Sequence, residues 1–271
     1  MNFNRQSFLS NIPEVVKNLL IINVIMLLAT MVLESQGVNL TSILGIHHFS
    51  SPEFQPYQLV TYMFMHGNFM HLFFNMFALY MFGKVLETVW GPKRFLLYYM
   101  VTGVGAAIIN MIVQTFALNG LEEAVNYYVL NPTPSNFELF LDDHGGGGNY
   151  MQFIAEFTQN AQNSEYIEAT ISKAKQILVM TRDIPTVGAS GSVFGILLAF
   201  GMLFPNTQLM LLIPPIPIKA KYFVIIYGAI ELYSGISNNP GDNVAHFAHL
   251  GGMLFGYFLI IYWKKDTNQF Y

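Results

Sequence analysis

Two short motifs place a hydroxyl and an imidazole inside strongly apolar stretches of the chain. Gly188-Ala189-Ser190-Gly191 opens one such stretch, and about sixty residues later Ala248-His249 opens another, followed by Gly252 and Gly256. Polar side chains are costly in hydrocarbon, so those found there usually have a function. A serine hydroxyl becomes a good nucleophile when a base takes its proton, and histidine is the base best suited to neutral pH. This pair therefore predicts a serine hydrolase that works inside a membrane.

A second polar pair lies in an earlier apolar stretch. His71 and Asn75 are four residues apart, so they share one face of a helix. The oxyanion that forms when Ser190 attacks a carbonyl needs hydrogen-bond donors, which the Ser190 backbone N–H, the Asn75 amide and the His71 ring could supply. One such donor typically contributes about 3–4 kcal/mol of transition-state stabilisation. His66 is expected to support this group or to be structural.

Several assignments have a competitor. His246 is three residues from His249 on nearly the same face, but the glycines at 252 and 256 follow His249 on its own face. Ser192 is interpreted as a packing residue. A serine in a Gly/Ala/Ser helix face is also more often a packing residue, so the nucleophile assignment depends on the convergence of several motifs.

The base has no obvious carboxylate partner in the sequence. Asp242 is the nearest acid to His249, in a short Asn/Pro/Gly turn, and Glu231 is given no role. A Ser-His dyad is therefore expected, with the ring of Phe194, one turn after Ser190, packing against the imidazole. Glu87 is expected to be a structural anchor that pairs with nearby basic residues.

The composition is that of a polytopic membrane protein. Hydrophobic residues make up 53% and charged residues 10% of 271 positions, with a mean hydropathy of +0.42, whereas soluble domains carry about 25% charged residues. Cysteine is absent, which excludes disulfides and thiolate metal sites. No basic cluster suggests nucleic acid, so none is expected as a partner. The predicted membrane spans are about 18–35, 68–87, 95–117, 187–204, 221–237 and 245–263.

Basic residues predict the orientation of these spans. Nine of the twelve lie at the N-terminus, in the 2–3 and 4–5 turns or at the C-terminus, which share one side if there are six spans. Because Lys and Arg favour the cytoplasmic side, both termini are expected in the cytoplasm, with a retained first span and a bacterial inner membrane as the setting. Spans 2, 4 and 6 then all run inward, which brings the polar candidates to one depth near the outer leaflet.

The segment 118–186 between spans 3 and 4 differs from the rest of the chain. It has nine acidic and three basic residues, with Pro132, Pro134 and a glycine run at 145–148. Apolar residues recur at helical spacing over 151–180, with an interruption near 162–164. We therefore expect a polar loop insert, flexible at first and then helical, whose helix lies on the outer membrane surface.

Taken together, these motifs resemble those of the rhomboid intramembrane serine proteases. Gly188-x-Ser190-Gly191 is similar to the family's GxSG motif, Ala248-His249-x-x-Gly252-x-x-x-Gly256 to its AHxxGxxxG motif, and His66-x4-His71-x3-Asn75 to its second-helix HxxxN region. The resemblance covers about 18–117 and 187–263, and the insert departs from compact members. It implies Ser190 as nucleophile, His249 as base, and His71 with Asn75 in the oxyanion hole.

By this resemblance the chain is one all-α, six-helix membrane domain over residues 1–271. It is expected to cleave single-span membrane proteins in the bilayer without a cofactor or metal, near small and helix-breaking residues. The weak fifth span, preceded by Pro214, Pro215 and Pro217, is the expected moving element. Two alternatives remain: a catalytically dead binder of membrane clients, and a metal transporter or metalloprotease that uses His66, His71, His246 and His249. The oligomeric state is left open.

Overall fold

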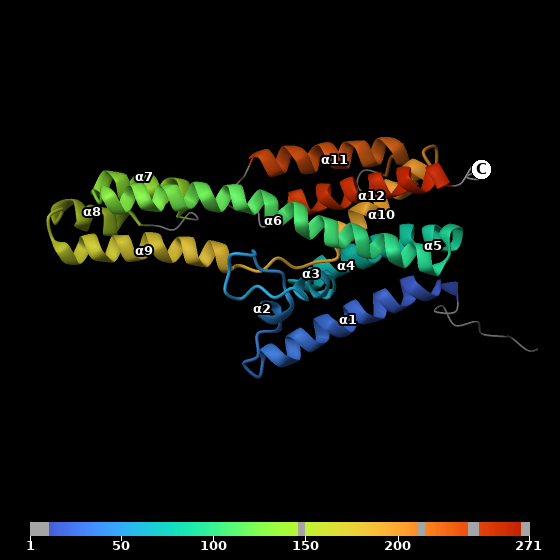
Figure 1. Cartoon of the computed structure of the whole chain (residues 1–271), viewed down its shortest axis with the longest axis horizontal. Helices are drawn as coiled ribbons and strands as arrows, with labels where there is room; N and C mark the ends of the chain where they lie inside the picture. Colours follow the sequence, from blue (N-terminus) through green and yellow to red (C-terminus); the bar gives the residue numbers. More distant parts are fainter. Residues whose placement is uncertain (1–10, 146–149, 211–214, 238–243, 267–271) are drawn as a thin grey trace, which may run out of the picture.

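The computed structural model describes residues 11–145, 150–210, 215–237 and 244–266, and most of these residues are helical (Figure 1). Gly146, Gly147, Gly148, Pro214 and Asp242 lie outside them. The elements are α1 (Glu14–Glu34), α2 (Leu40–Leu44), α3 (Gln58–Thr61), the 3-10 turn η2 (Tyr62–Phe64), α4 (Phe69–Ala78), the π-helical turn η3 (Leu79–Gly83), α5 (Lys84–Trp90), α6 (Pro92–Leu130), α7 (Pro134–His144), α8 (Met151–Gln159), α9 (Ser164–Asp183), α10 (Ser190–Leu203), β1 (Gln208–Met210), β2 (Pro217–Lys219), α11 (Ala220–Ser237) and α12 (His246–Asp266).

Helices occupy each of the six ranges expected to cross a membrane. Among the described residues, three of them are long and apolar enough to do so by length and composition: Glu14–Glu34, the continuous α4–η3–α5 unit Phe69–Trp90, and Pro92–Leu130. The helix Ser190–Leu203 is apolar but shorter. An antiparallel hairpin of β1 and β2 joins α10 to α11. The architecture is therefore mostly helical, as the all-α prediction requires apart from this short β1–β2 pair, and the count of six spans stays a prediction.

Small residues let α6, α10 and α12 pack almost backbone to backbone. A Cβ added at Gly252 of α12 would lie 1.9 Å from the carbonyl oxygen of Gly191 on α10. A Cβ at Gly191 would meet Ala106 of α6 at 2.4 Å, and one at Gly195 would meet Thr102 at 2.7 Å. Small residues at such spacing are typical of close helix packing in membranes. The same stripe keeps Ser190 and His249 on touching helices.

Glu87 is a structural anchor, but its partners differ from those expected. Its carboxylate accepts hydrogen bonds from the backbone N–H groups of Val15 at 2.9 Å and Val16 at 2.8 Å. These donors lie in the first turn of α1, where backbone N–H groups lack intrahelical partners and the helix dipole favours a negative charge. Glu87 therefore fixes the start of α1 against α5 through backbone N–H groups, and within residues 11–145, 150–210, 215–237 and 244–266 no basic side chain pairs with it.

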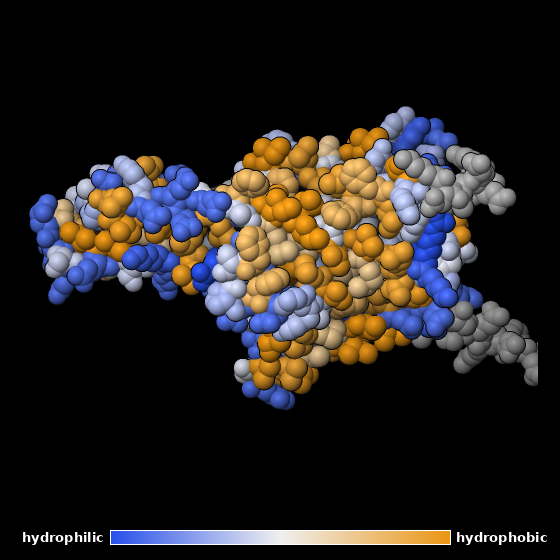
Figure 2. Space-filling view, viewed as in Figure 1, coloured by the Kyte–Doolittle hydropathy of each residue, from blue (hydrophilic) through white to orange (hydrophobic). Residues whose placement is uncertain are grey.

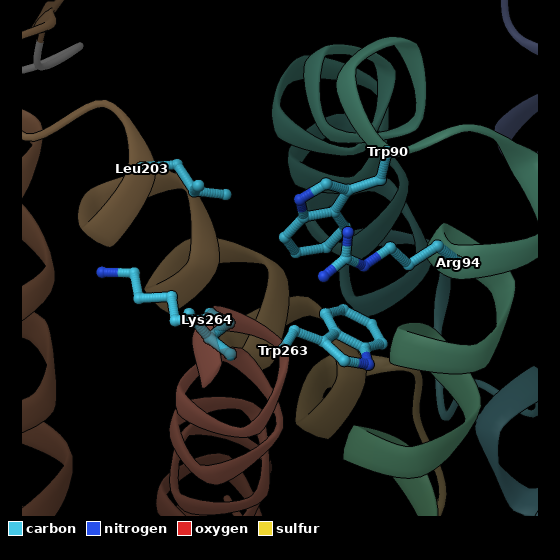
Figure 3. A pocket seen from close by; sticks show the side chains of 6 residues that line it. Trp90, Arg94, Leu203, Trp263 and Lys264 are labelled. Atoms are coloured by element: carbon cyan, nitrogen blue, oxygen red, sulfur yellow. The ribbon is translucent and has the colours of Figure 1, made fainter. Parts of the chain in front are cut away.

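The end of the bundle beyond α5 and α12 carries aromatic and basic residues. The guanidinium of Arg94 lies over the ring of Trp263, 4.1 Å from its centroid, and the rings of Trp90 and Trp263 meet edge to face at 5.5 Å (Figure 3). The hollow between them measures only about 10 Å³. α1 begins and α12 ends at this same end of the molecule (Figure 1). Tryptophan with basic residues is typical of a membrane–water interface.

The insert is not a loop over most of its length. α6 continues without a break to Leu130, and α7, α8 and α9 fold against its extension to form a projection away from the chain ends (Figure 1). Its own core contains Leu121, Val125, Tyr128, Phe137, Phe140, Leu141, Phe157 and Ala174. The Tyr128 hydroxyl donates to Thr170 Oγ1 at 2.6 Å across this core. The apolar stripe of 151–180 thus packs onto α6 and α7, because these helices offer it a protein partner.

The surface divides in the same way. Figure 2 shows a broad hydrophobic surface over the body of the molecule, with hydrophilic residues at the end where α12 finishes and a mixed surface over the α7–α9 projection. The interruption expected near 162–164 is present as the break between α8 and α9. The insert is therefore a small helical projection built on the long α6.

Candidate active site

Ser190 is the first residue of α10, and the backbone before it is shaped by Gly188. Gly188 has φ +134°, which L side chains rarely adopt, and its N–H donates to the Tyr62 carbonyl at 3.0 Å. A Cβ at Gly188 would lie 2.8 Å from the His71 Nε2 and 3.5 Å from the Ser190 Oγ. Glycine therefore allows the α9–α10 connection to approach α4 closely. The Ser190 hydroxyl and the His71 ring both face this one point.

The start of α10 also offers backbone donors. The first N–H groups of a helix have no intrahelical acceptor, and the helix dipole makes this end partly positive. Ser190 contributes one of these N–H groups, and its hydroxyl is attached to the same residue. Negative charge that develops beside Ser190 would therefore be stabilised by the helix itself.

His249 is held on two sides. Its ring stacks on Phe194 of α10 with centroids 4.2 Å apart and an interplanar angle of 5°, which is the contact expected from the one-turn spacing of Phe194 after Ser190. Ala248 and His249 are both buried, His249 at 7% exposure. One turn further along α12, Gly252 touches the backbone of Gly191. The imidazole therefore cannot turn away from α10 without disturbing this packing.

The other edge of His249 meets a carboxylate that the sequence interpretation did not use. His249 Nδ1 lies 2.8 Å from Glu231 Oε2, and His246 Nδ1 lies 2.6 Å from the same oxygen. The sequence offers no carboxylate partner for His249 and gives Glu231 no role, whereas the structure brings Glu231 to the base from α11, and not from the helices of Ser190 or His249. A glutamate within an apolar helix was the available signal. Its partner could not be identified before the packing of α11 on α12 was known.

This contact determines the protonation pattern of the ring. An imidazole whose Nδ1–H donates to a carboxylate keeps the lone pair on Nε2, which is the state that a general base requires. Among the described residues, no hydrogen bond joins Ser190 Oγ to the His249 ring. Catalytic hydrogen bonds are often long before substrate binds and tighten only in the complex. The contact with Glu231 thus orients the His249 ring for its role as base, and the hydrogen bond between Ser190 Oγ and His249 Nε2 is expected to form when substrate binds.

The donors expected from α4 are near the serine but are only partly aimed at it. The His71 Nε2 lies 2.8 Å from the position that a Cβ on Gly188 would take, and Ser190 Oγ lies 3.5 Å from the same position. Asn75 is buried, and its amide Nδ2 donates to the His71 carbonyl at 2.9 Å. One N–H of the Asn75 amide is therefore occupied within α4, and its second N–H is the donor available to an oxyanion. His66 is also buried, stands edge to face with His71 at 5.0 Å, and has no partner among the described residues for either ring nitrogen.

The remaining polar candidates have structural contacts. The Ser192 hydroxyl donates to the Tyr99 carbonyl at 2.8 Å, so it is a packing residue as expected. His47 and His48 lie between α2 and α3, where the His48 Nε2 and the Thr115 Oγ1 of α6 share a hydrogen bond at 3.0 Å. Among the predicted site residues, the structure brings the His71 ring and Ser190 Oγ together around Gly188 and places His249 against Phe194 of α10.

Glu231, His246 and His249 together have the donor atoms of a metal site, so their separations can be compared with those of metal ligands. Single ligand atoms of Glu231, His246 and His249 lie within 4.8 Å of one another. Two ligands about 2.0–2.1 Å from a tetrahedral zinc lie roughly 3.3 Å apart. The separations of 2.6 and 2.8 Å are instead those of direct hydrogen bonds. The cluster is arranged as a carboxylate that accepts from two imidazoles.

Comparisons with known proteins agree with the motifs. The family model described as the Rhomboid domain matches residues 53–125 and 146–265. A segment of 57 residues is 46% identical to part of "Rhomboid-like protein 11, chloroplastic" of Arabidopsis thaliana. This segment makes up 21% of this chain and 20% of that protein. The chain thus matches about a fifth of the length of this curated relative. Because the family model covers most of the chain, including the helices that carry Ser190, His249 and Asn75, this multi-pass membrane protein belongs to the rhomboid family of intramembrane proteases.

Proposed function

We propose that this protein is an active serine endopeptidase that cleaves transmembrane segments, with Ser190 as nucleophile and His249 as base. The observation that carries the proposal is the meeting of three helices at the head of α10. Ser190 and the His71 ring lie around Gly188, while His249 is stacked on Phe194 with its Nδ1 on a carboxylate. The chain keeps both the Ser190 hydroxyl and the His249 imidazole, with the imidazole stacked on Phe194 and bonded to a carboxylate, which argues against a catalytically dead binder.

The geometry supports a standard acyl-transfer sequence. Ser190 Oγ attacks the carbonyl carbon of the scissile bond as its proton passes to His249 Nε2. The tetrahedral oxyanion accepts hydrogen bonds from the Ser190 N–H, from His71 and from the second amide N–H of Asn75. His249 then gives the proton to the leaving amine, which breaks the C–N bond. Water activated by the same imidazole releases the acyl group and regenerates the serine.

The proposed substrates are single-span membrane proteins. A transmembrane helix uses its carbonyls in i to i−4 hydrogen bonds, so the substrate must unwind before Ser190 can reach one. Small residues around the bond and helix-breaking residues nearby remain the expected preference. α11 stays the proposed moving element, since its buried side chains are few: Ala220, Val224 and Glu231. Its bonds to α12 through Glu231 would act as the pivot of such a movement.

The orientation and location are part of the proposal. α1 begins and α12 ends at the same end of the molecule (Figure 1), and Trp90, Arg94 and Trp263 lie close together near the end of α12 (Figure 3). We propose that this end faces the cytoplasm and the α7–α9 projection the opposite side of a bacterial inner membrane, with six spans in one domain. The matched Arabidopsis relative is described as chloroplastic. No cofactor or nucleic acid takes part in the proposed reaction.

The test is labelling and cleavage by the purified, membrane-inserted protein. The unsubstituted protein should react with a fluorophosphonate or isocoumarin probe and cut a model transmembrane substrate. Ser190→Ala should lose both activities and His249→Ala should lose cleavage, with the folded protein retained in the membrane. His246→Ala should keep substantial activity. A dead His246 variant with an active His249 variant would overturn the base assignment, and cleavage by the Ser190 variant would overturn the proposed function.

A further inference from the structure

Glu231 is an acidic residue buried in an otherwise apolar membrane helix. It is 7% exposed, while its neighbours Ile230 and Leu232 are about half exposed, at 51% and 48%, on the outer face of α11. An ionised carboxylate in such a place is costly unless it is paired and hydrogen-bonded. Its Oε2 satisfies this requirement with two imidazole Nδ1 atoms, at 2.6 and 2.8 Å. These two contacts connect α11 with the helix that carries the base.

We propose that Glu231 is the positioning residue of a Ser190–His249–Glu231 triad, and that His246 holds Glu231 in place. This inference rests on the proposed function and adds a third member to its dyad. Glu231 accepts from His249 Nδ1–H on the edge opposite the one that must face the serine. It thereby selects the tautomer with a free Nε2 and stabilises the imidazolium that forms when Ser190 is deprotonated.

The proton balance of this arrangement is simple. The Ser190 proton moves to His249 Nε2 and from there to the leaving amine, and the Nδ1 proton stays on the ring throughout. Glu231 remains ionised and transfers no proton. His246 donates its own Nδ1–H to the same oxygen, which fixes the carboxylate from a second direction. Because α11 supplies the acid, the position of this helix also sets the state of the base.

A purely structural role is the main competitor. The two bonds of Glu231 could serve only to fasten α11 to α12, as Glu87 fastens α1 to α5. Such a fastening would change folding and substrate admission but not the ionisation of His249. An adjacent carboxylate, by contrast, favours the charged form of an imidazole and raises its pKa. The pH dependence of the reaction therefore separates the two roles.

The decisive variant is Glu231→Gln in the full chain, with Glu87→Gln as a matched buried control. Loss of the charge should lower kcat about 100-fold or more with little change in KM, because the group acts in the transition state. The acid limb of the kcat/KM profile should move to lower pH, since the imidazolium loses its counter-charge. Glu87→Gln should leave this limb in place.

Two further variants keep the test valid if the Glu231→Gln protein misfolds. Glu231→Asp keeps the charge and should keep the acid limb of the unsubstituted protein while recovering much of kcat. His246→Ala keeps Glu231 and should lose less than about tenfold. A chelator such as EDTA should leave cleavage unchanged, because the cluster is a hydrogen-bonded group.

Three results would overturn the triad. The first is a Glu231→Gln variant whose kcat and acid limb are both unchanged. The second is a Glu231→Gln variant that loses kcat while its acid limb stays in place, with no recovery of kcat in Glu231→Asp. The third is an activity of the unsubstituted protein that disappears with EDTA and returns with Zn²⁺. If Ser190→Ala itself remained active, the proposed function would fail first. A dead Ser190 variant together with an unaffected Glu231→Gln variant would refute the triad alone.

Discussion

Gly252 is the point where α12 touches the backbone of α10, so Gly252→Ala directly tests how the dyad is positioned. The added Cβ would lie 1.9 Å from the Gly191 carbonyl oxygen, 2.7 Å from its carbonyl carbon and 3.2 Å from its Cα. Real Cβ contacts are not shorter than about 3.0 Å. The gap must therefore widen from 1.9 to 3.0 Å, or by roughly 1.1 Å. Because the contacting atoms are backbone, the helices themselves must move apart.

This displacement occurs one turn from His249. Ser190 is adjacent to Gly191, so a movement at this contact separates the nucleophile from the base. A misplacement of about 1 Å can cost on the order of 100-fold in rate, which corresponds to about 2.7 kcal/mol of transition-state stabilisation. We therefore expect Gly252→Ala to lower both the rate of fluorophosphonate labelling and the rate of substrate cleavage about 100-fold.

Two other glycines provide graded controls. A Cβ at Gly256 would meet the hydroxyl of the buried Tyr98 at 2.3 Å, one turn further along α12 from His249 than Gly252, so Gly256→Ala should disturb the position of the base less. Gly120 on α6 has nothing within 4 Å of its Cβ position, so Gly120→Ala should match the unsubstituted protein. Thermal unfolding in detergent would identify global loss of structure. A folded Gly252→Ala variant with an unchanged labelling rate would refute the reasoning.

The remaining predictions concern the oxyanion hole, the insert and the first helix. Asn75→Ala should lower turnover about 10²–10³-fold and His71→Ala by less, since other donors remain; unchanged turnover in both would place the donors elsewhere. Replacing 122–180 with a short Gly/Ser linker should preserve probe labelling of Ser190 but alter the rate or preference for transmembrane substrates. Loss of labelling in a folded, inserted variant would make the insert part of the active site. Glu87→Ala should destabilise the protein by about 2–4 kcal/mol in detergent unfolding, because two buried N–H groups of α1 lose a charged acceptor; a change below about 0.5 kcal/mol would contradict this.

The sequence by itself determined the family of the protein and predicted its reactive groups. The apolar stretches and sparse charges identified the membrane helices, because the length and hydropathy of a span are local properties. The motifs around Ser190, His249 and Asn75 were sufficient for the family, which the family model confirms. The contact between Phe194 and His249 was also predictable, since Phe194 lies one turn from Ser190 on the same helix.

The tertiary structure alone decided which distant groups meet. Glu231 reaches His249 from a helix whose packing no local pattern encodes, and Glu87 meets the start of α1 across 71 and 72 positions of sequence. The apolar stripe of 151–180 suited either a membrane surface or a protein core, and the extension of α6 to Leu130 provides the core. Periodicity shows which side chains share a face, but the partner of that face depends on how whole helices pack. For this reason the reactive groups were readable from the sequence, whereas the groups that orient them were not.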